Sequence, residues 1–159
     1  LESPLAWSFE HVGCPAPGTH SRVVMRERLH DHLILRGGAI VLDEAVRDVL
    51  GISLPGQPQA LVQDASGERS IQWLSPDEWL VIVPGGEEFP LETKLREQLG
   101  SAHFAISDVS GGQTLLELSG EAARELLMKT VIYDVHPCNF VFIKRVVVTV
   151  CVSVVFTVQ

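Results

Sequence analysis

The hydrophobic positions of this chain form short runs, and the most legible of them lie between residues 70 and 100. Ser70 to Leu74 has the character of a strand, and Trp79 to Val83 is apolar throughout, as expected of a buried strand. The two segments flank Ser-Pro-Asp-Glu, a sequence with turn chemistry. They predict two strands. Leu91 to Leu99 has the apolar spacing of a helix, and the glycine that follows can end it.

The order strand, strand, helix then occurs a second time. His103 to Val109 alternates as a strand does, Ser110-Gly111-Gly112 can turn the chain, and Gln113 to Leu118 is a Leu-rich second strand. Glu121 to Met128 is a predicted helix. The side chains expected on its inward face are Ala122, Ala123, Leu126 and Leu127. Together the two halves predict an α+β fold with a largely antiparallel sheet and helices on one side.

The first third of the chain is less regular. Residues 1–20 contain three prolines and two glycines and are expected to form an irregular arm. His32 to Arg36 is a predicted strand. Asp43 to Leu50 is a predicted helix, with Asp43 as its cap and Gly51 as its end.

The last residues are rich in valine. Val146 to Val158 is β-branched and partly alternating, which predicts a strand-like tail over residues 141–159. The run is too short for a membrane helix, which needs about 20 apolar residues. We expect residues 1–159 to form a single domain that includes the arm and the tail.

Composition narrows the class of protein further. The net charge of −8 and the scattered 12 Lys and Arg argue against a nucleic-acid partner. Cys14, Cys138 and Cys151 form no C-x-x-C pair, which argues against a zinc knuckle or a redox dithiol, and unpaired cysteines suit a reducing compartment. The first residues lack the pattern of a signal peptide. We expect a cytoplasmic protein without a membrane partner.

Two histidines are the first candidates for metal binding. On a strand, His30 and His32 would lie on the same face. No third ligand stands at a recognisable spacing, so a hydrogen-bonded pair is the favoured interpretation. The glycine pairs at 85–86 and 111–112 fit neither a dinucleotide loop nor a P-loop.

Two further sets could supply acid-base chemistry: Asp108 with Ser110, and Asp134 with His136. The chain has no Gly-x-Ser-x-Gly nucleophile motif. Asp and Ser at strand ends more often bond the nearby backbone, so turn and cap chemistry is favoured for both sets.

Trp73 and Trp79 flank the predicted turn and are candidate interface residues, because tryptophan is enriched at interfaces. The alternative, given equal weight, is that one of them packs in the core and the other covers it.

Three segments together resemble the gamma subunit of heterotetrameric sarcosine oxidases. They are Trp73 to Leu80, preceded by Leu50 to Pro55; Ser107 to Ser110, followed by Leu116 to Leu127; and Asp134 to Phe140. The resemblance covers about residues 45–140. It is not expected to continue after Phe140.

The resemblance implies a fold like the folate-binding domain of the glycine-cleavage aminomethyltransferases. It implies a cytoplasmic complex of alpha, beta, gamma and delta subunits that oxidatively demethylates sarcosine to glycine, forms H2O2 and transfers a one-carbon unit to tetrahydrofolate. In such a complex FAD, FMN, NAD, tetrahydrofolate and zinc belong to the other subunits. No catalytic, cofactor-binding or metal residue is therefore assigned to this chain, and the alpha subunit is the expected direct contact.

Two alternatives stay open at this point. The chain could be a free-standing folate-binding or aminomethyltransferase-like protein, in which Asp108 would be the first candidate for a pterin carboxylate. It could also be an interaction module that binds a partner through the Trp73–Trp79 hairpin.

Overall fold

The computed structural model describes residues 22–130, Leu5, Trp7, Asp134, His136, and the backbone of two strands near the end, β8 (Val146–Val150) and β9 (Val152–Phe156). The chain divides into two compact units, one of residues 29–113 and the other of residues 1–28 with 114–159. Each unit is a set of residues in mutual contact, and this division does not test whether the chain is one domain. The single domain expected over residues 1–159 therefore stays a prediction.

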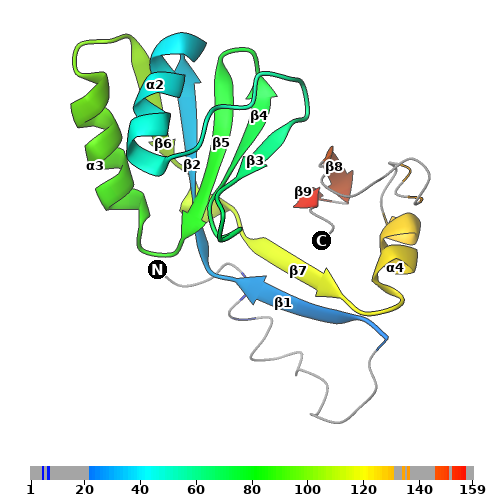
Figure 1. Ribbon diagram of the computed structural model, residues 1–159. Coiled ribbons are helices and arrows are strands. Elements are labelled where there is room, and N and C mark those ends of the chain that lie inside the picture. The colour runs from blue at the N-terminus through cyan, green and yellow to red at the C-terminus, as the bar shows by residue number, and fades with distance from the viewer. Residues whose placement is uncertain are drawn as a thin grey trace. The chain divides into compact units, whose positions relative to one another are not determined.

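The unit of residues 29–113 is built on a five-stranded antiparallel sheet of order β3-β4-β5-β2-β6 (Figure 1). Its strands are β2 (His30–Gly37), β3 (Leu61–Gln63), β4 (Ser70–Ser75), β5 (Glu78–Pro84) and β6 (Phe104–Asp108). Helices α2 (Ala39–Leu50) and α3 (Glu88–Leu99) pack on one face of this sheet. The predicted α+β fold, with an antiparallel sheet and helices on one side, is confirmed.

The core of this unit lies between that face and the two helices. The middle of β5, the central strand, is apolar and buried: each residue from Trp79 to Val83 is at most 6% exposed. Alternate residues of the strands point into the core, which is what the period-two geometry of a strand requires. The buried core residues are Leu33, Leu35, Leu42, Ala45, Val46, Ile52, Ile71, Trp79, Val81, Val83, Leu91, Leu95, Leu99 and Ile106.

Strands β4 and β5 form the hairpin that the sequence predicts. Trp73 stands opposite Trp79, and the chain turns at Pro76 and Asp77. The turn is joined to β2, because the backbone N–H of Gly37 donates to the Asp77 carbonyl oxygen at 3.0 Å.

Helix α2 begins four residues earlier than predicted, so the expected capping role of Asp43 is wrong. Gly38 is the N-cap residue, and it makes no side-chain cap. The Asp43 carboxylate instead accepts a hydrogen bond from the backbone N–H of Leu54 at 2.7 Å and pairs with Arg47. The helix does end at Gly51, which has φ 70° and donates its N–H to the Arg47 carbonyl, as predicted.

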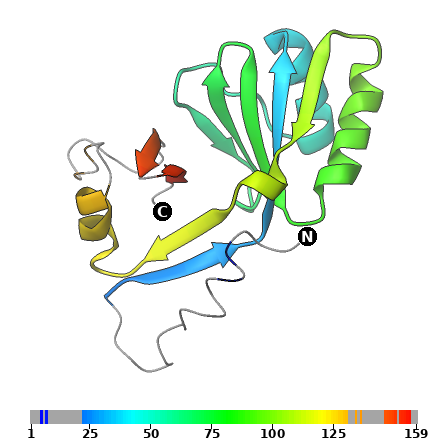
Figure 2. The same ribbon diagram turned by 180° about the vertical axis from the view of Figure 1, so that it is seen from behind.

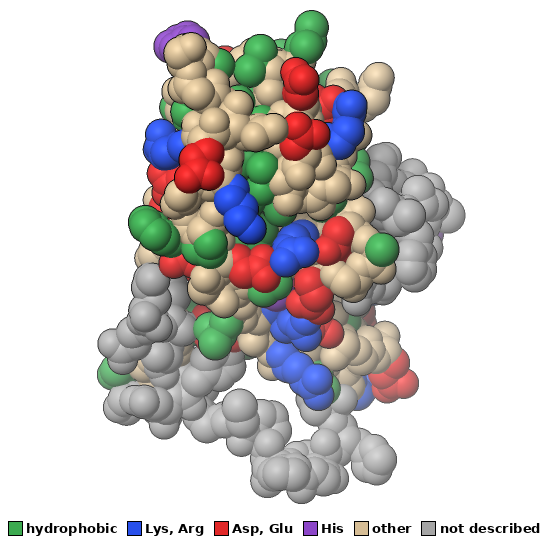
Figure 3. Space-filling view, turned by 60° about the vertical axis from the view of Figure 1, so that its left-hand side comes forward, with side chains coloured by type: hydrophobic (Ala, Val, Ile, Leu, Met, Phe, Trp, Pro, Cys, Tyr) green, Lys and Arg blue, Asp and Glu red, His purple; other side chains and the backbone are tan. Residues whose placement is uncertain are grey.

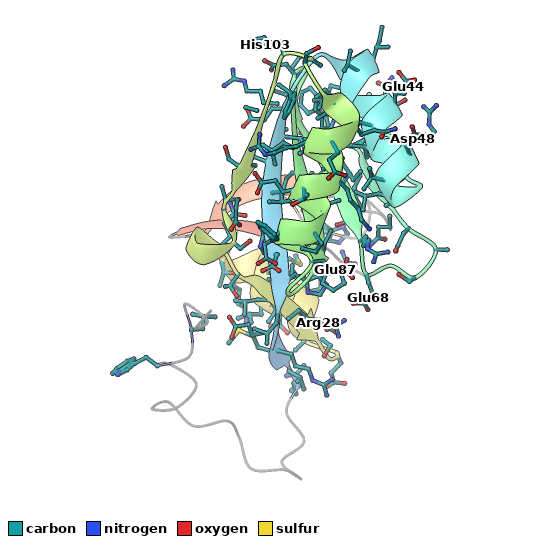
Figure 4. All side chains as sticks on the ribbon, turned by 90° about the vertical axis from the view of Figure 1, so that its left-hand side faces the viewer. Arg28, Glu44, Asp48, Glu68, Glu87 and His103 are labelled. Carbon is teal, nitrogen blue, oxygen red and sulfur yellow. The ribbon has the colours of Figure 1, made fainter. Side chains whose placement is uncertain are left out.

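Replacing Asp43 by alanine is expected to lower the free energy of unfolding by about 1–2 kcal/mol, because the Leu54 N–H would lose its acceptor. Urea-induced unfolding would measure the change. Glu44→Ala is the control, since Glu44 is exposed on the same helix (Figure 4). Equal losses in the two variants would contradict this role of Asp43.

Helix α3 also extends beyond its predicted start, from Leu91 back to Glu88. It ends at Gly100, whose N–H donates to the Arg96 carbonyl, as the sequence predicts. The helices are linked at the surface by Gln98, whose amide donates to Asp48 of α2 at 2.8 Å. Figure 4 shows Asp48 on the outer side of α2.

The second unit contains the two-stranded ribbons β1–β7 and β8–β9 and, among its described residues, helix α4. β1 (Val24–Arg28) pairs with β7 (Leu115–Ser119), and the two run side by side in Figures 1 and 2. α4 (Ala123–Thr130) follows, two residues later than predicted. Of the side chains expected on its inward face, Leu127 is 5% exposed but Leu126 is 40% exposed, so the inward placement of Leu126 is wrong.

The repeated order of elements is confirmed, as β4-β5-α3 and then β6-β7-α4. The two halves nevertheless pair differently. β4 and β5 pair with each other, whereas β6 pairs with β2, and β7 pairs with β1. The sequence order of elements therefore does not imply a repeated pairing.

The valine-rich tail contains two strands where one was predicted. β8 and β9 pair antiparallel with each other, with Val146 opposite Phe156 and Val150 opposite Val152. In the part of the chain that the structure describes, no helix has the length and apolar character needed to cross a membrane.

Candidate functional site

The two histidines of β2 lie on one face of the strand, as predicted. His32 is 3% exposed, and its Nδ1 atom is buried without a hydrogen-bond partner. His30 Nε2 lies 3.6 Å from a carboxylate oxygen of Glu68. Burial lowers the pKa of His32, the neighbouring His30 lowers it further, and the charges of Asp31 and Asp108 act in the opposite direction. The neutral imidazole is therefore favoured at position 32.

A metal centre finds no support in this cluster. Among the described residues, no three His, Cys, Asp or Glu side chains are grouped so that they could hold a metal ion. The three cysteines lie outside the described residues.

Asp108 and Ser110 lie together at the corner between β6 and a short 3-10 helix, η1 (Ser110–Gly112). The hydroxyl and the backbone N–H of Ser110 both donate to Asp108 Oδ1, the latter at 2.9 Å. These two bonds hold the pKa of Asp108 below its usual range, and the bond from the Ser110 hydroxyl has the larger effect. Ser110 Oγ also accepts the backbone N–H of His32 at 2.9 Å.

This arrangement is the turn chemistry that the sequence predicts. The Ser110 hydroxyl is engaged by the Asp108 carboxylate and by the main chain of His32, so its bonds join β6 to β2. Asp134 behaves similarly, because its carboxylate accepts the backbone N–H of His136 at 2.9 Å. Both sets therefore bond nearby backbone. A catalytic function of either set is not supported by these contacts.

The two tryptophans occupy different environments. Trp79 is 2% exposed, and its indole N–H donates to the Pro55 carbonyl oxygen at 3.0 Å. Trp73 is half-buried and packs against the same core. The ring of Trp79 is thus covered within the chain, and Trp73 keeps exposed surface. Their function at an interface stays a prediction.

The structure also places large hydrophobic side chains in contact with solvent, which the sequence analysis did not single out. Ile40 is 85% exposed in the first turn of α2, and Phe89 is 74% exposed in the first turn of α3. Figure 3 shows one face on which hydrophobic side chains lie among charged ones. The large exposed hydrophobic side chains among the described residues are Trp7, Val24, Met25, Leu29, Ile40, Val41, Phe89, Leu126 and Met128.

A signal for this exposed set was present in the sequence but was weak. Ile40 and Val41 precede the predicted start of α2, and Phe89 precedes that of α3. Because each helix begins earlier than predicted, the side chains of Ile40, Val41 and Phe89 belong to the helices but lie outside the apolar stripe that faces the core. Exposed hydrophobic residues that are scattered singly are ordinary, and it is a contiguous apolar patch that is typical of a surface covered by a partner.

The fold of this chain is similar to that of an aminomethyltransferase. It is similar to the glycine cleavage system aminomethyltransferase T of Bartonella henselae, with a TM-score of 0.56, 14% identity, and coverage of 91% of this chain and 40% of that one. This likeness concerns the fold alone.

The family is defined by sequence. Residues 37–157 match the sarcosine oxidase, gamma subunit family, and the chain belongs to that family. The match runs through the valine-rich tail, so the expectation that the resemblance ends after Phe140 is wrong. These findings favour the gamma subunit over a free-standing folate-binding protein.

Individual relatives agree with this assignment. The chain is 38% identical over 104 residues to the sarcosine oxidase subunit gamma of Corynebacterium sp. (strain P-1), covering 65% of this chain and 48% of that protein. It is 38% identical over 96 residues to the sarcosine oxidase subunit gamma of Arthrobacter sp., covering 60% of this chain and 46% of that protein. The chain thus spans about half the length of the curated relatives that it matches.

A solved structure is also similar over most of the chain. A chain of the heterotetrameric sarcosine oxidase from Corynebacterium sp. U-96, in complex with pyrrole 2-carboxylate, has a TM-score of 0.76 and 26% identity. The similarity covers 95% of this chain and 76% of that chain.

Proposed function

We propose that this chain is a non-catalytic structural and assembly subunit of a heterotetrameric sarcosine oxidase. The observation that carries the proposal is the family match over residues 37–157, together with the likeness in fold to a chain of such a complex. The complex would oxidatively demethylate sarcosine to glycine, form H2O2 and transfer the one-carbon unit to tetrahydrofolate. We place it in the cytoplasm.

The partners of this chain would be the alpha, beta and delta subunits, with alpha as the most direct contact. FAD, FMN, NAD, tetrahydrofolate and zinc would be bound by those subunits. In support, the Asp108 and Asp134 carboxylates accept backbone N–H groups two residues away, and the Ser110 hydroxyl accepts the backbone N–H of His32.

The contact surface is proposed to include exposed apolar side chains of the helices and the half-buried Trp73. Ile40 and Phe89 are the best candidates, because each is at least 74% exposed and covering such a side chain is favourable. Large hydrophobic and aromatic side chains also contribute most to the centres of interfaces.

Affinity copurification of the tagged chain from its native cells tests the assignment. We expect a yellow complex with three further subunits, flavin absorbance bands and turnover of sarcosine. A colourless chain recovered alone would contradict the proposed function.

Two substitutions test the contact surface. Ile40→Ser and Phe89→Ser are expected to reduce recovery of the other subunits while changing the unfolding midpoint of the chain little, because both side chains are largely exposed. Glu97→Gln, at an exposed position of α3, is the control. Recovery of all partners by the Ile40 and Phe89 variants at the wild-type level would exclude these residues from the interface.

A further inference from the structure

A buried histidine lies on the face of the five-stranded sheet that is turned away from the helices. Leu33 and Leu35 of β2 point into the core, so His32, at an alternate position, projects from the opposite face. Ile82 of β5 stands opposite His32 and is 6% exposed. Because only 3% of His32 is exposed, its imidazole has little access to water.

The surroundings of this imidazole suit its neutral form. The Nδ1 atom of His32 is buried and has no hydrogen-bond partner. A neutral imidazole leaves one ring nitrogen without a proton, whereas a protonated imidazole carries an N–H on both nitrogens. The charged form would therefore bury an Nδ1–H donor without an acceptor, in addition to burying the charge itself.

The two carboxylates whose charges favour the protonated form are bound to other groups. Asp31, the neighbour on β2, accepts the backbone N–H of Gly86. Asp108, at the end of β6, accepts both the hydroxyl and the backbone N–H of Ser110. Asp31 and Asp108 act on His32 through their charge and not through a hydrogen bond. A proton on His32 would thus lack a directly bound negative partner.

A second histidine of β2 opposes a charge at position 32. His30 lies two residues away on the same face, and its side chain is 8% exposed. Its Nε2 atom lies 3.6 Å from a carboxylate oxygen of Glu68, so a proton on His30 has a negative partner. Burial is the largest cause that lowers the pKa of His32, and the charge of His30 is the next.

The backbone of His32 joins β2 to the corner formed by residues 108–110. Its N–H donates to Ser110 Oγ at 2.9 Å, and its carbonyl oxygen accepts the N–H of Val109 at 2.9 Å. β6 is an edge strand of the sheet and pairs with β2, so these two bonds continue the β2–β6 ladder beyond Asp108. A change at His32 therefore acts on the attachment of this corner.

We propose that His32 makes this corner sensitive to acid: protonation of its buried imidazole weakens the bonds to Val109 and Ser110, and the corner detaches from β2 as the pH falls. At neutral pH the imidazole is uncharged and the corner is attached. The direction follows from linkage. A folded-state pKa below the unfolded value of about 6.5 gives stability that is complete above that value. The stability is lost as the pH falls toward the folded-state pKa.

NMR titration of the imidazole rings of the 15N-labelled full chain tests the protonation directly. We expect His32 to titrate below the ordinary value of about 6.5, because burial and the unpartnered Nδ1 disfavour its charged form. A His32 ring that titrates at or above the ordinary value would overturn the proposal.

Urea unfolding from about pH 7.5 to about pH 5.5 tests the effect on stability. His32→Gln has no charge in this range, so the wild type should lose stability relative to this variant as the pH falls. The expected loss is up to about tenfold in the folding equilibrium constant for each pH unit. His103→Gln removes an exposed histidine between α3 and β6 (Figure 4) and should follow the wild type. Parallel curves for the wild type and His32→Gln would show that the proposal is wrong.

Amide hydrogen exchange of the wild type locates the effect and needs no variant. After correction for the intrinsic effect of pH on exchange, the protection of the Val109 N–H should fall over the same pH range. The fall should exceed that at the Gly51 N–H, which bonds the Arg47 carbonyl at the end of α2. Protection at Val109 that stays constant, or that falls no more than at Gly51, would contradict a weakening at this corner.

Discussion

Replacing Trp79 by alanine is expected to lower the free energy of unfolding by about 3–5 kcal/mol, the range for removing a large aromatic side chain from a core. Trp79 is 2% exposed and lies on β5, at the centre of the sheet. Its loss would open a cavity between the sheet and the helices and leave the Pro55 carbonyl without its donor. Urea-induced unfolding of the full chain would measure the change.

Two control variants separate the causes of this loss. Trp79→Phe keeps most of the apolar volume but removes the indole N–H, and should cost less, about 1–2 kcal/mol for the hydrogen bond. Trp73→Ala removes a half-buried ring from the opposite strand and should also cost less than Trp79→Ala. A Trp79→Ala variant no less stable than Trp73→Ala would contradict the central packing of Trp79.

Replacing Gly120 by alanine should destabilise the unit that contains β1 and β7 by about 3 kcal/mol, from backbone strain and a steric clash together. Gly120 has φ 107°, and a β-carbon there would lie 2.5 Å from the Arg22 carbonyl oxygen. That oxygen is held in place, because it accepts the backbone N–H of Ala122 at 3.0 Å. Amide hydrogen exchange at Ala122 and the urea midpoint would both report the loss.

Gly51→Ala is the matched control for this substitution. Gly51 also has a positive φ, of 70°, but a β-carbon there would have no atom within 4 Å. The cost should be the conformational strain alone, about 1 kcal/mol. If the two alanine variants were equally stable, the close approach of Arg22 to Gly120 would not be a constraint on the fold.

The elements that could be predicted from the sequence are those with a local signal. Trp79 to Val83 is an unbroken apolar run because β5 is buried on both faces, and Gly51 marks a helix end because few other residues adopt its conformation easily. The hairpin before α3 could be predicted because Pro76 and Asp77 favour a turn. These signals lie within a few residues of the structure that they predict.

The errors arose where the deciding partner is distant in sequence. β1 has the sequence Val-Met-Arg-Glu-Arg, which has no strand periodicity, and it becomes a strand by pairing with β7, about ninety residues later. The sequence predicts Asp43 as a helix cap, but its carboxylate accepts the Leu54 N–H beyond the end of that helix. Periodicity alone could not decide between Leu126 and Leu127.

The residues of the candidate site also divide into those with a local sequence signal and those whose function depends on distant partners. The sequence alone indicated the family, through motifs whose residues now have structural functions: Pro55 accepts the indole N–H of Trp79, and Ser110 joins β6 to β2. It also indicated that Asp108 and Ser110 engage in turn chemistry, since both partners lie within three residues.

By itself, then, the sequence determined the α+β class, the order of most elements and the gamma subunit family, because periodicity, turn residues and motifs are local properties of the chain. Only the tertiary structure decided which strands pair, that Trp79 is covered while Ile40 and Phe89 are exposed, and that the Asp31 carboxylate binds the turn before α3 through the Gly86 N–H. These features depend on contacts between residues far apart in the chain, and such contacts exist only after β2, β5 and α3 have packed together.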